Sequence, residues 1–423
     1  MTRSDLRVML GAEHRHTKGV VMLRFLPAAR IAAWVVLPAA VVLAASPALA
    51  ATGWTVVTAP PTGDNGYLLA VSADSTTDAW AVGTVNRTGA DPGPLTDHWN
   101  GTAWSQATPP SYPTTDTVSL DAVSAARSTD AWAAGFTKVG TKGEALPATA
   151  HWNGTSWSVV TPAECTTGGA TVASYLLGVA DVSPTEAFVV GECTSQATGY
   201  IEQWNGSAWS MATLPDPNTT NPGMTKSLSA ISADSASDVW AVGEYTIVYT
   251  PTGIRYEPYS LHWNGSTWSV VAMPPVPGTD GQLVYQFNAI DAISPTNVWA
   301  VGDSGDDVGV GGSPTATLIE HYNGTSWSVV SSPAGGTTPY LNGVAASSAS
   351  DVWAVGYDAP TSTSGAQTLT MNWTGSSWST ATSPDVGSSS LLVGVSSTPG
   401  GPIWAAGYSG TSGAFNPLII QHS

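Results

Sequence analysis

The chain of 423 residues carries 12 Lys and Arg against 30 Asp and Glu, a formal net charge of −18, and it contains two cysteines. This length allows one large domain or two to three ordinary ones. Charged residues make up only 10% of the chain and glycine occurs 44 times, which disfavours a coiled coil or a charged disordered segment and favours β-structure with many turns. A nucleic-acid-binding protein is also disfavoured, because contacts to phosphates need clustered Lys and Arg.

The first 50 residues have the pattern of a secretory signal peptide. Two arginines precede an apolar run over residues 31–43, and an Ala-Leu-Ala triplet ending at Ala50 matches a signal-peptidase site. We therefore expect cleavage after Ala50 and a secreted chain of residues 51–423 without a membrane span, with Met22 as a second candidate start. The alternative is an N-terminal anchor that is not removed. Cleavage leaves six basic and 28 acidic residues, a net charge of −22.

A six-residue motif recurs along the rest of the chain. It reads DVWAVG in its most regular form, and seven copies run from Asp78 to Gly407 with a mean period of 54 residues. A second motif of the form HWNGTSW follows each of the first six copies. The seventh copy of this second motif is split, because residues 418–423 match its first half and residues 53–57 match its second half.

Each repeat contains four short runs rich in residues that favour β-strands. Four strands repeated seven times predict an all-β chain that forms a seven-bladed β-propeller with four-stranded blades, as a single domain over residues 51–423. The split motif predicts that the ring closes by pairing the N-terminal strand with the C-terminal blade, which protects the sheet edges. The alternative is an open β-solenoid.

The WNGxxW motif predicts a tight turn between the third and fourth strands. If Gly101 and Thr102 form a two-residue turn, Asn100 faces Ala103 and the two tryptophans on either side face each other across the hairpin. A turn centred on Asn-Gly would break that symmetry. Truncation of either tryptophan should therefore damage the fold and not only a site.

The DVWAVG and HWNGTSWS repeats resemble those of secreted bacterial propeller proteins, which are most common in high-GC actinobacteria and are grouped with kelch or galactose-oxidase-like propellers. The WNGTSW turn is also similar to the Asp-box of sialidase-like propellers, but it lacks the Asp. The resemblance covers nearly all of residues 51–423. It implies the fold and export, and it implies no particular activity, since the residues of a galactose-oxidase-type copper site are not recognisable here.

The repeated polar residues are expected to be structural. Four histidines occupy one equivalent position in four different repeats, so they cannot jointly bind one metal ion: His98, His151, His262 and His321. The recurrent Asp that begins the DVWAVG motif is expected to bond its own turn. The stretch Asp303–Asp307 offers closely spaced oxygen ligands for calcium but lacks the spacing of a known calcium loop. We therefore predict no cofactor and no metal site.

Strand alternation places the connections between the second and third strands on one face of the disc. These connections are long and variable, and they comprise Thr84–Leu95, Phe136–Pro147, Glu244–Pro258, Asp303–Ala316 and Tyr357–Ala366. Because binding residues tend to lie on variable loops held by a rigid scaffold, we place the site on this face. Cys165 and Cys193 fall on the same face, and two cysteines in an exported chain predict one disulfide.

The residue that follows the glycine of the DVWAVG motif varies around the ring. It is acidic in three consecutive repeats (Glu192, Glu244 and Asp303), aromatic in three others (Phe136, Tyr357 and Tyr408) and Thr84 in the first. If these residues point into the mouth of the disc, the acids can bind sugar hydroxyls or a cation and the rings can stack on a sugar face. Alternatively they complete the packing between blades. A second aromatic cluster lies in the fourth repeat: Tyr245, Tyr249, Tyr256 and Tyr259.

The preferred interpretation is a secreted, monomeric binding or scaffold protein without catalytic activity that recognises carbohydrate or a cell-surface glycan. The alternative is a hydrolase or lyase acting on polysaccharide through Glu192, Glu244 and Asp303, although no pair of carboxylates stands out in the sequence. A disc that binds another protein is a third possibility. A sialidase is disfavoured, because only three arginines remain after the predicted cleavage.

Overall fold

A computed structural model describes residues 53–140, 143–194, 198–218, 225–249, 253–274, 283–306, 314–360, 365–411 and 413–423. All regular secondary structure in these ranges is β-strand. The strands belong to one compact unit, Thr52–Ser423. The predicted signal peptide and its cleavage site lie outside the described residues, and within the described residues no helix could cross a bilayer.

Six of the repeats each form an antiparallel meander of four strands in chain order, which we call a sheet; a single parallel pair, Thr198 with Lys226, joins the third meander to the fourth. The first three sheets contain β2 (Gly66–Ser75), β3 (Asp78–Arg87), β4 (Ala90–Trp99), β5 (Trp104–Gln106); β6 (Asp116–Arg127), β7 (Asp130–Val139), β8 (Ala145–Trp152), β9 (Trp157–Val160); and β12 (Ser174–Ser183), β13 (Glu186–Cys193), β14 (Thr198–Trp204), β15 (Trp209–Met211). The next three contain β16 (Lys226–Ser235), β17 (Asp238–Tyr249), β18 (Gly253–Trp263), β19 (Trp268–Ala272); β20 (Leu283–Ser294), β21 (Asn297–Asp306), β22 (Ala316–Tyr322), β23 (Trp327–Val329); and β24 (Pro339–Ser348), β25 (Asp351–Asp358), β26 (Gln367–Trp373), β27 (Trp378–Ala381). A small hairpin of β10 (Thr166–Thr167) and β11 (Ala170–Thr171) precedes β12.

The two ends of the described chain share the last sheet. It contains β28 (Ser389–Ser397), β29 (Ile403–Thr411), β30 (Ala414–His422) and β1 (Trp54–Val57). Strand β1 pairs antiparallel with β30, from Trp54 opposite His422 to Val57 opposite Ile419. This is the pairing that the split motif predicts.

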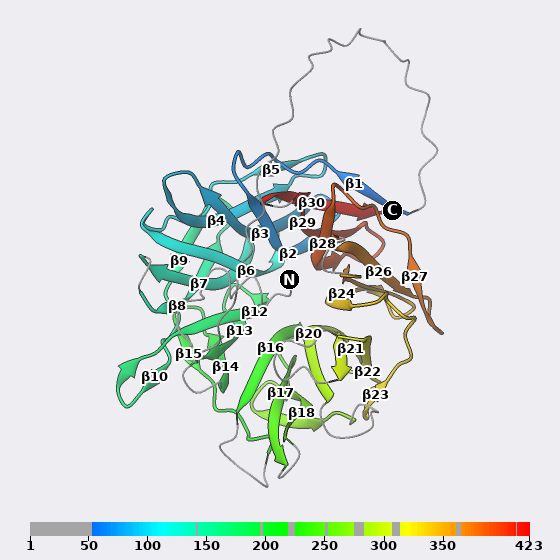
Figure 1. Cartoon of the computed structure of the whole chain (residues 1–423). Coiled ribbons are helices and arrows are strands. Elements are labelled where there is room, and N and C mark those ends of the chain that lie inside the picture. Colours follow the sequence, from blue (N-terminus) through cyan, green and yellow to red (C-terminus); the bar gives the residue numbers. More distant parts are fainter. Residues whose placement is uncertain are drawn as a thin grey trace. The chain divides into compact units, whose positions relative to one another are not determined.

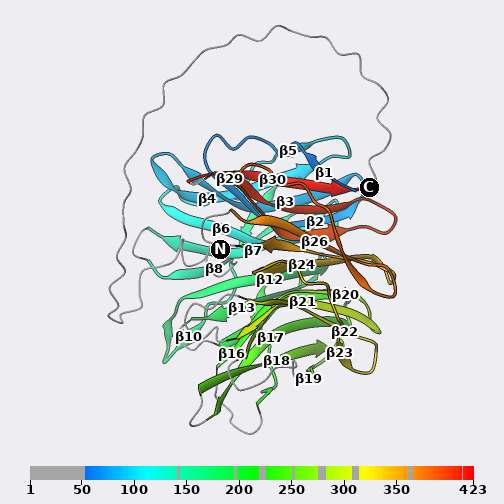
Figure 2. The same ribbon diagram turned by 45° about the vertical axis from the view of Figure 1, so that its right-hand side comes forward.

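The first strand of each sheet lies beside the first strand of the next, and β28 lies beside β2 (Figures 1 and 2). Serine side chains link these strands, since Ser72 Oγ accepts a hydrogen bond from Ala125 N at 3.0 Å. Ser232 Oγ binds Ala292 N in the same way, and Ser396 Oγ in the last sheet binds Ala73 N in the first, both at 3.0 Å. Sheets of four antiparallel strands joined through their first strands form a β-propeller-type architecture.

The tryptophans of the DVWAVG motif form the core between sheets. Five of them are at most 1% exposed: Trp80, Trp132, Trp240, Trp299 and Trp404. In four sheets the repeated histidine covers this ring, with ring centroids 4.3 Å apart for Trp240 and His262 and 4.2 Å apart for Trp299 and His321. The histidines are therefore structural, as their repetition predicts.

In three sheets the recurrent Asp binds the histidine of the neighbouring strand, beyond the turn that we expected it to bond. Asp351 does bond its own hairpin, because it accepts a hydrogen bond from Ser347 just before the turn. Asp238 Oδ1 accepts hydrogen bonds from His262 Nε2 at 2.7 Å and from Trp240 Nε1 at 3.0 Å. Asn297 accepts the same bond from His321 at 2.7 Å. Register explains the difference, because the second and third strands bring the Asp and the histidine together only once the sheet has formed.

The WNGxxW motif forms the predicted two-residue turn. Trp99 pairs with Trp104, and Asn100 N donates to Ala103 O at 3.3 Å. Gly101 has a φ of 90°, which only glycine adopts readily. The Asn100 side-chain oxygen accepts hydrogen bonds from the backbone N–H groups of Thr102 and Ala103, both at 3.0 Å, so the Asn is committed to the turn.

Candidate functional site

Two of the variable connections are extended hairpins over their described residues and not long loops, which corrects the sequence-based expectation for these two. Strands β3 and β4 continue to Arg87 and Ala90, and strands β17 and β18 remain paired out to Tyr249 and Gly253. The additional residues of these two connections continue the strands, because backbone groups that pair across a hairpin need no other hydrogen-bond partners. The other three variable connections include residues outside the described ranges, as does the β17–β18 connection at residues 250–252. We call the ends of these hairpins, beyond the DVWAVG glycines, the hairpin face.

The three aromatic residues after the motif glycine do not form a stacking surface. Phe136 and Tyr357 are 1% exposed and Tyr408 is 4% exposed. Phe136 contacts Tyr175 of the next sheet with ring centroids 5.0 Å apart, and Tyr408 contacts Tyr67 of the first sheet at 5.0 Å. The prediction that these rings stack on a sugar is therefore wrong. Phe136 and Tyr408 complete the packing between sheets, whereas Tyr357 stacks on Tyr340 of its own sheet with ring centroids 4.6 Å apart.

The three acids after the motif glycine lie in three consecutive sheets, and two of them act on the third. The pKa of Glu244 is raised to about 8, mainly by burial and also by the nearby charges of Asp303 and Glu192, against an opposing hydrogen bond from Ser227. Burial also raises the pKa of Asp303 to about 7. We call Glu192, Glu244 and Asp303 the acidic cluster.

Asn288 fixes the position of one member of the acidic cluster. Its Nδ2 donates to Asp303 Oδ2 at 2.9 Å and to Leu341 O of the next sheet at 2.9 Å. Hydrogen bonding to the ionised form lowers the pKa of Asp303, but burial outweighs it. At neutral pH the cluster therefore contains carboxyl groups near their midpoint of ionisation, which can both donate and accept hydrogen bonds.

The predicted tyrosine cluster is divided between the two faces of the β17–β18 hairpin. Tyr245 pairs with Glu257, and its hydroxyl donates to Glu257 Oε2 at 3.1 Å. Tyr259 lies on the same face and is 4% exposed. Tyr256 pairs with Thr246 and lies on the opposite face, because successive side chains of a strand alternate. Tyr249 lies in β17, but its side chain is outside the described part of the molecule.

Cys165 and Cys193 form the predicted disulfide, with their Cα atoms 6.0 Å apart. It ties the segment before β12 to the end of β13, one residue after Glu192. The candidate calcium segment is a strand up to Asp306, and Asp307 lies outside the described residues. In the described ranges no three His, Cys, Asp or Glu side chains are placed to hold a metal ion.

Two sets of polar residues were not predicted from the sequence. One is a set of buried acids in the third strands: Asp97, Glu202 and Glu320, all 0% exposed. The other lines a polar pocket beside the start of β2 and includes Asn65, Asn86 and Asn416. The three acids share one repeat position that the other repeats fill with an apolar residue, which is a signal that the sequence contains, whereas the pocket asparagines lie outside the repeated motifs. The pocket residues come from both ends of the chain, and only the closed register brings them together.

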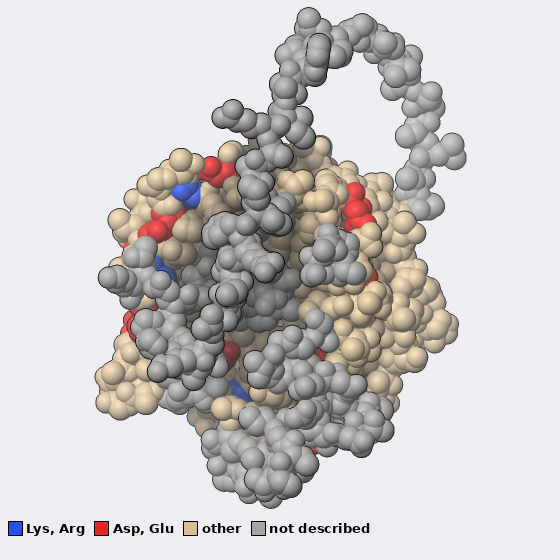
Figure 3. Space-filling model, viewed as in Figure 1, with Lys and Arg blue, Asp and Glu red and all other residues tan. Residues whose placement is uncertain are grey.

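Charged groups are sparse on the surface. On the side shown in Figure 3 the described surface is mostly uncharged, and the acidic and basic atoms lie in small separate groups. A broad electrostatic attraction for a charged polymer is therefore not a feature of this side of the molecule.

No protein-family model and no curated protein matches the sequence. Among solved structures, YCF48 from Cyanidioschyzon merolae is similar, with a TM-score of 0.49 and 14% identity over 88% of this chain and 98% of that chain. The GH74 xyloglucanase from Xanthomonas campestris has a TM-score of 0.47 and 14% identity over 86% of this chain and 55% of that chain. Trypanosoma rangeli sialidase has a TM-score of 0.44 and 7% identity over 88% of this chain and 60% of that chain. Similarity at this level assigns no activity to the chain.

Proposed function

We propose that this protein is a secreted, monomeric, seven-bladed β-propeller, closed by the pairing of β1 with β30, that binds carbohydrate on its hairpin face without catalysis. The seven DVWAVG copies, the contact of β28 with β2 and the shared last sheet support the closed ring. The apolar run and Ala-Leu-Ala triplet near the N-terminus support secretion.

The observation that carries the binding proposal is the acidic cluster. Three sheets each contribute one carboxyl group at the same strand position, and the pKa values of Glu244 and Asp303 lie at about 8 and 7. Carboxyl groups that both donate and accept hydrogen bonds match sugar hydroxyls, which do the same. The acidic net charge of the chain disfavours an anionic ligand, so the ligand class that fits best is neutral carbohydrate.

The same pKa values favour a second candidate, a polysaccharide hydrolase or lyase. A general acid works best when its pKa lies near the operating pH, and Glu244 and Asp303 meet that condition at neutral pH. In this alternative the carboxyl groups transfer protons during cleavage of a glycosidic bond instead of only binding hydroxyls.

The experiment that separates the two is a binding screen read for turnover. The purified full-length chain is applied to an array of neutral and uronic-acid oligosaccharides, and reducing-sugar release is assayed on every retained member. Retention without release, weakened about tenfold in Glu244→Gln, supports the binding protein. Release that disappears in Glu244→Gln supports the hydrolase.

Glu144→Gln is the matched control, because Glu144 is an exposed acid just before β8 on the hairpin face and outside the acidic cluster. It should bind like the wild type. Equal loss in both variants would show that net charge and not the cluster governs binding. An array without any retained member would contradict the proposed function.

A further inference from the structure

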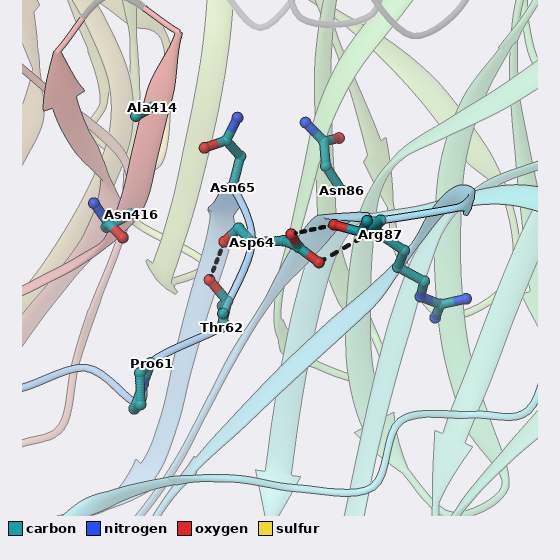
Figure 4. Close-up of a pocket in the computed structure, with 10 residues that line it drawn as sticks. Pro61, Thr62, Asp64, Asn65, Asn86, Arg87, Ala414 and Asn416 are labelled. Atoms are coloured by element: carbon teal, nitrogen blue, oxygen red, sulfur yellow. Dashed lines mark hydrogen bonds between the residues drawn. The ribbon is translucent and has the colours of Figure 1, made fainter.

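A polar pocket of about 550 Å³ lies at the junction of the first and last sheets, away from the acidic cluster in the sequence. Its walls come from three segments: the residues before β2, the end of β3 and the start of β30. Both ends of the described chain thus contribute to it. Figure 4 shows the side chains of Asn65, Asn86 and Asn416 arranged around this space.

Two of the wall residues form a fixed frame. Asn65 Nδ2 donates to Gly413 O at 3.0 Å, and Asn65 Oδ1 accepts from Phe415 N at 3.2 Å, so its amide links the first sheet to the β29–β30 hairpin. The Asp64 carboxylate accepts hydrogen bonds from Thr88 N at 3.2 Å and from Thr88 Oγ1 at 2.8 Å. The segment before β2 is therefore held to both hairpins before any ligand arrives.

Two other wall residues keep their side-chain amides available. Neither the Asn86 nor the Asn416 amide forms a hydrogen bond with another described residue, although Asn86 is half-buried. Each amide presents one carbonyl acceptor and one NH₂ donor. A pair of such groups on a rigid frame matches the donor and acceptor pattern of hydroxyl groups on a sugar ring.

Arg87 also lines the pocket, but its charged group does not lie among the asparagine side chains. The guanidinium of Arg87 is directed away from the three amides (Figure 4). It lies across Gly93 of β4, where an added Cβ would be only 1.8 Å from Arg87 Cζ. The Asp64 carboxylate also borders the pocket, where the hydrogen bond from Thr88 holds it in place. Its negative charge disfavours an anionic ligand.

We infer that this pocket is a second carbohydrate subsite, specific for a neutral sugar unit, in which Asn86 and Asn416 bind ring hydroxyls and Asn65 positions the two hairpins. The inference rests on the proposed function for the ligand class, but not on the acidic cluster for its location. The two sites use different residues, so substitution can test them one at a time.

The test measures the affinity of the purified protein for a neutral oligosaccharide retained on the array described above. The double variant Asn86→Ala/Asn416→Ala should weaken binding about tenfold or more. Asn416 is exposed, Asn86 is half-buried, and neither amide has a partner among the described residues, so the variant should melt close to the wild-type temperature. Gln106→Ala, an exposed amide on the outer strand of the same sheet, is the control and should bind like the wild type.

The remaining outcomes separate this inference from the proposed function. Unchanged binding by the double variant, with loss in Glu244→Gln, overturns the pocket and leaves the proposed function standing. Retention of uronic-acid oligosaccharides alone also overturns the pocket, because its lining predicts a neutral sugar. Failure to retain any oligosaccharide overturns both.

Discussion

At the scale of single residues, Asp238 shows how the repeated polar groups stabilise the fold. It is 2% exposed, and one of its carboxylate oxygens accepts hydrogen bonds from both His262 and Trp240. Asp238→Ala leaves the buried Trp240 and the half-buried His262 without this acceptor and should lower the free energy of unfolding by about 1–3 kcal/mol. Asp238→Asn should cost less, because Asn297 accepts the same histidine bond in the next sheet. Urea denaturation of both variants checks this, and equal stability of the Ala and Asn variants would refute the assigned role.

The residue scale is also where prediction from sequence failed for the site. Phe136 and Tyr408 were grouped with Glu192 and Glu244 because they share a strand position. The rings fit between neighbouring sheets and become buried, whereas Glu244 lies near enough to the acids of the adjacent sheets for their charges to raise its pKa. Which outcome applies depends on the first strand of the next sheet, and a strand position alone does not contain that information. Asn86 and Asn416 were missed for the same reason, since each occurs once and outside the repeats.

At the scale of elements, the turns and strands followed from the sequence because each occurs several times. The glycine of the WNGxxW turn illustrates why substitutions at this turn destabilise the fold. Gly265 has a φ of 90°, and an added Cβ would lie 3.0 Å from Ser237 Cβ. Gly265→Ala should therefore lower the free energy of unfolding by about 1–2 kcal/mol from backbone conformation alone, with a further cost from this contact.

Gly89 provides the comparison for that prediction. It has a φ of 79° at the end of the β3–β4 hairpin, and no atom lies within 4 Å of an added Cβ. Gly89→Ala should cost less than Gly265→Ala in thermal or urea unfolding. A larger loss for Gly89→Ala would show that the close contact at the turn does not matter.

At the scale of the whole molecule, buried acids predict that the protein is more stable in acid than at neutral pH. Burial raises the pKa of Glu320 to about 8 and of Asp97 to about 7, and neither carboxyl group has a hydrogen-bond partner among the described residues. The folded state thus binds more protons than the unfolded state between the ordinary pKa of these groups, near 4, and their folded values. Stability should be highest near pH 4 and fall as the pH rises towards 8. His321, whose pKa burial lowers, opposes this trend in part.

Glu320→Gln isolates one of these groups. The variant keeps the shape of the side chain but cannot ionise, so its urea midpoint should fall less between pH 4.5 and pH 8 than that of the wild type. One unit of pKa shift corresponds to about 1.4 kcal/mol, so the difference in pH dependence should be on the order of a few kcal/mol. Parallel pH profiles for the two proteins would mean that Glu320 is not protonated in the folded state.

Binding of carbohydrate to the hairpin face can be located by hydrogen–deuterium exchange of the full-length chain, with and without a retained oligosaccharide. Protection should appear in the hairpin ends, at residues 84–95 and 244–249, and should leave the WNGxxW turns at the opposite ends of the third strands unchanged. Protection confined to those turns or to the outer strands, with unchanged hairpin ends, would contradict the placement of the site on the hairpin face.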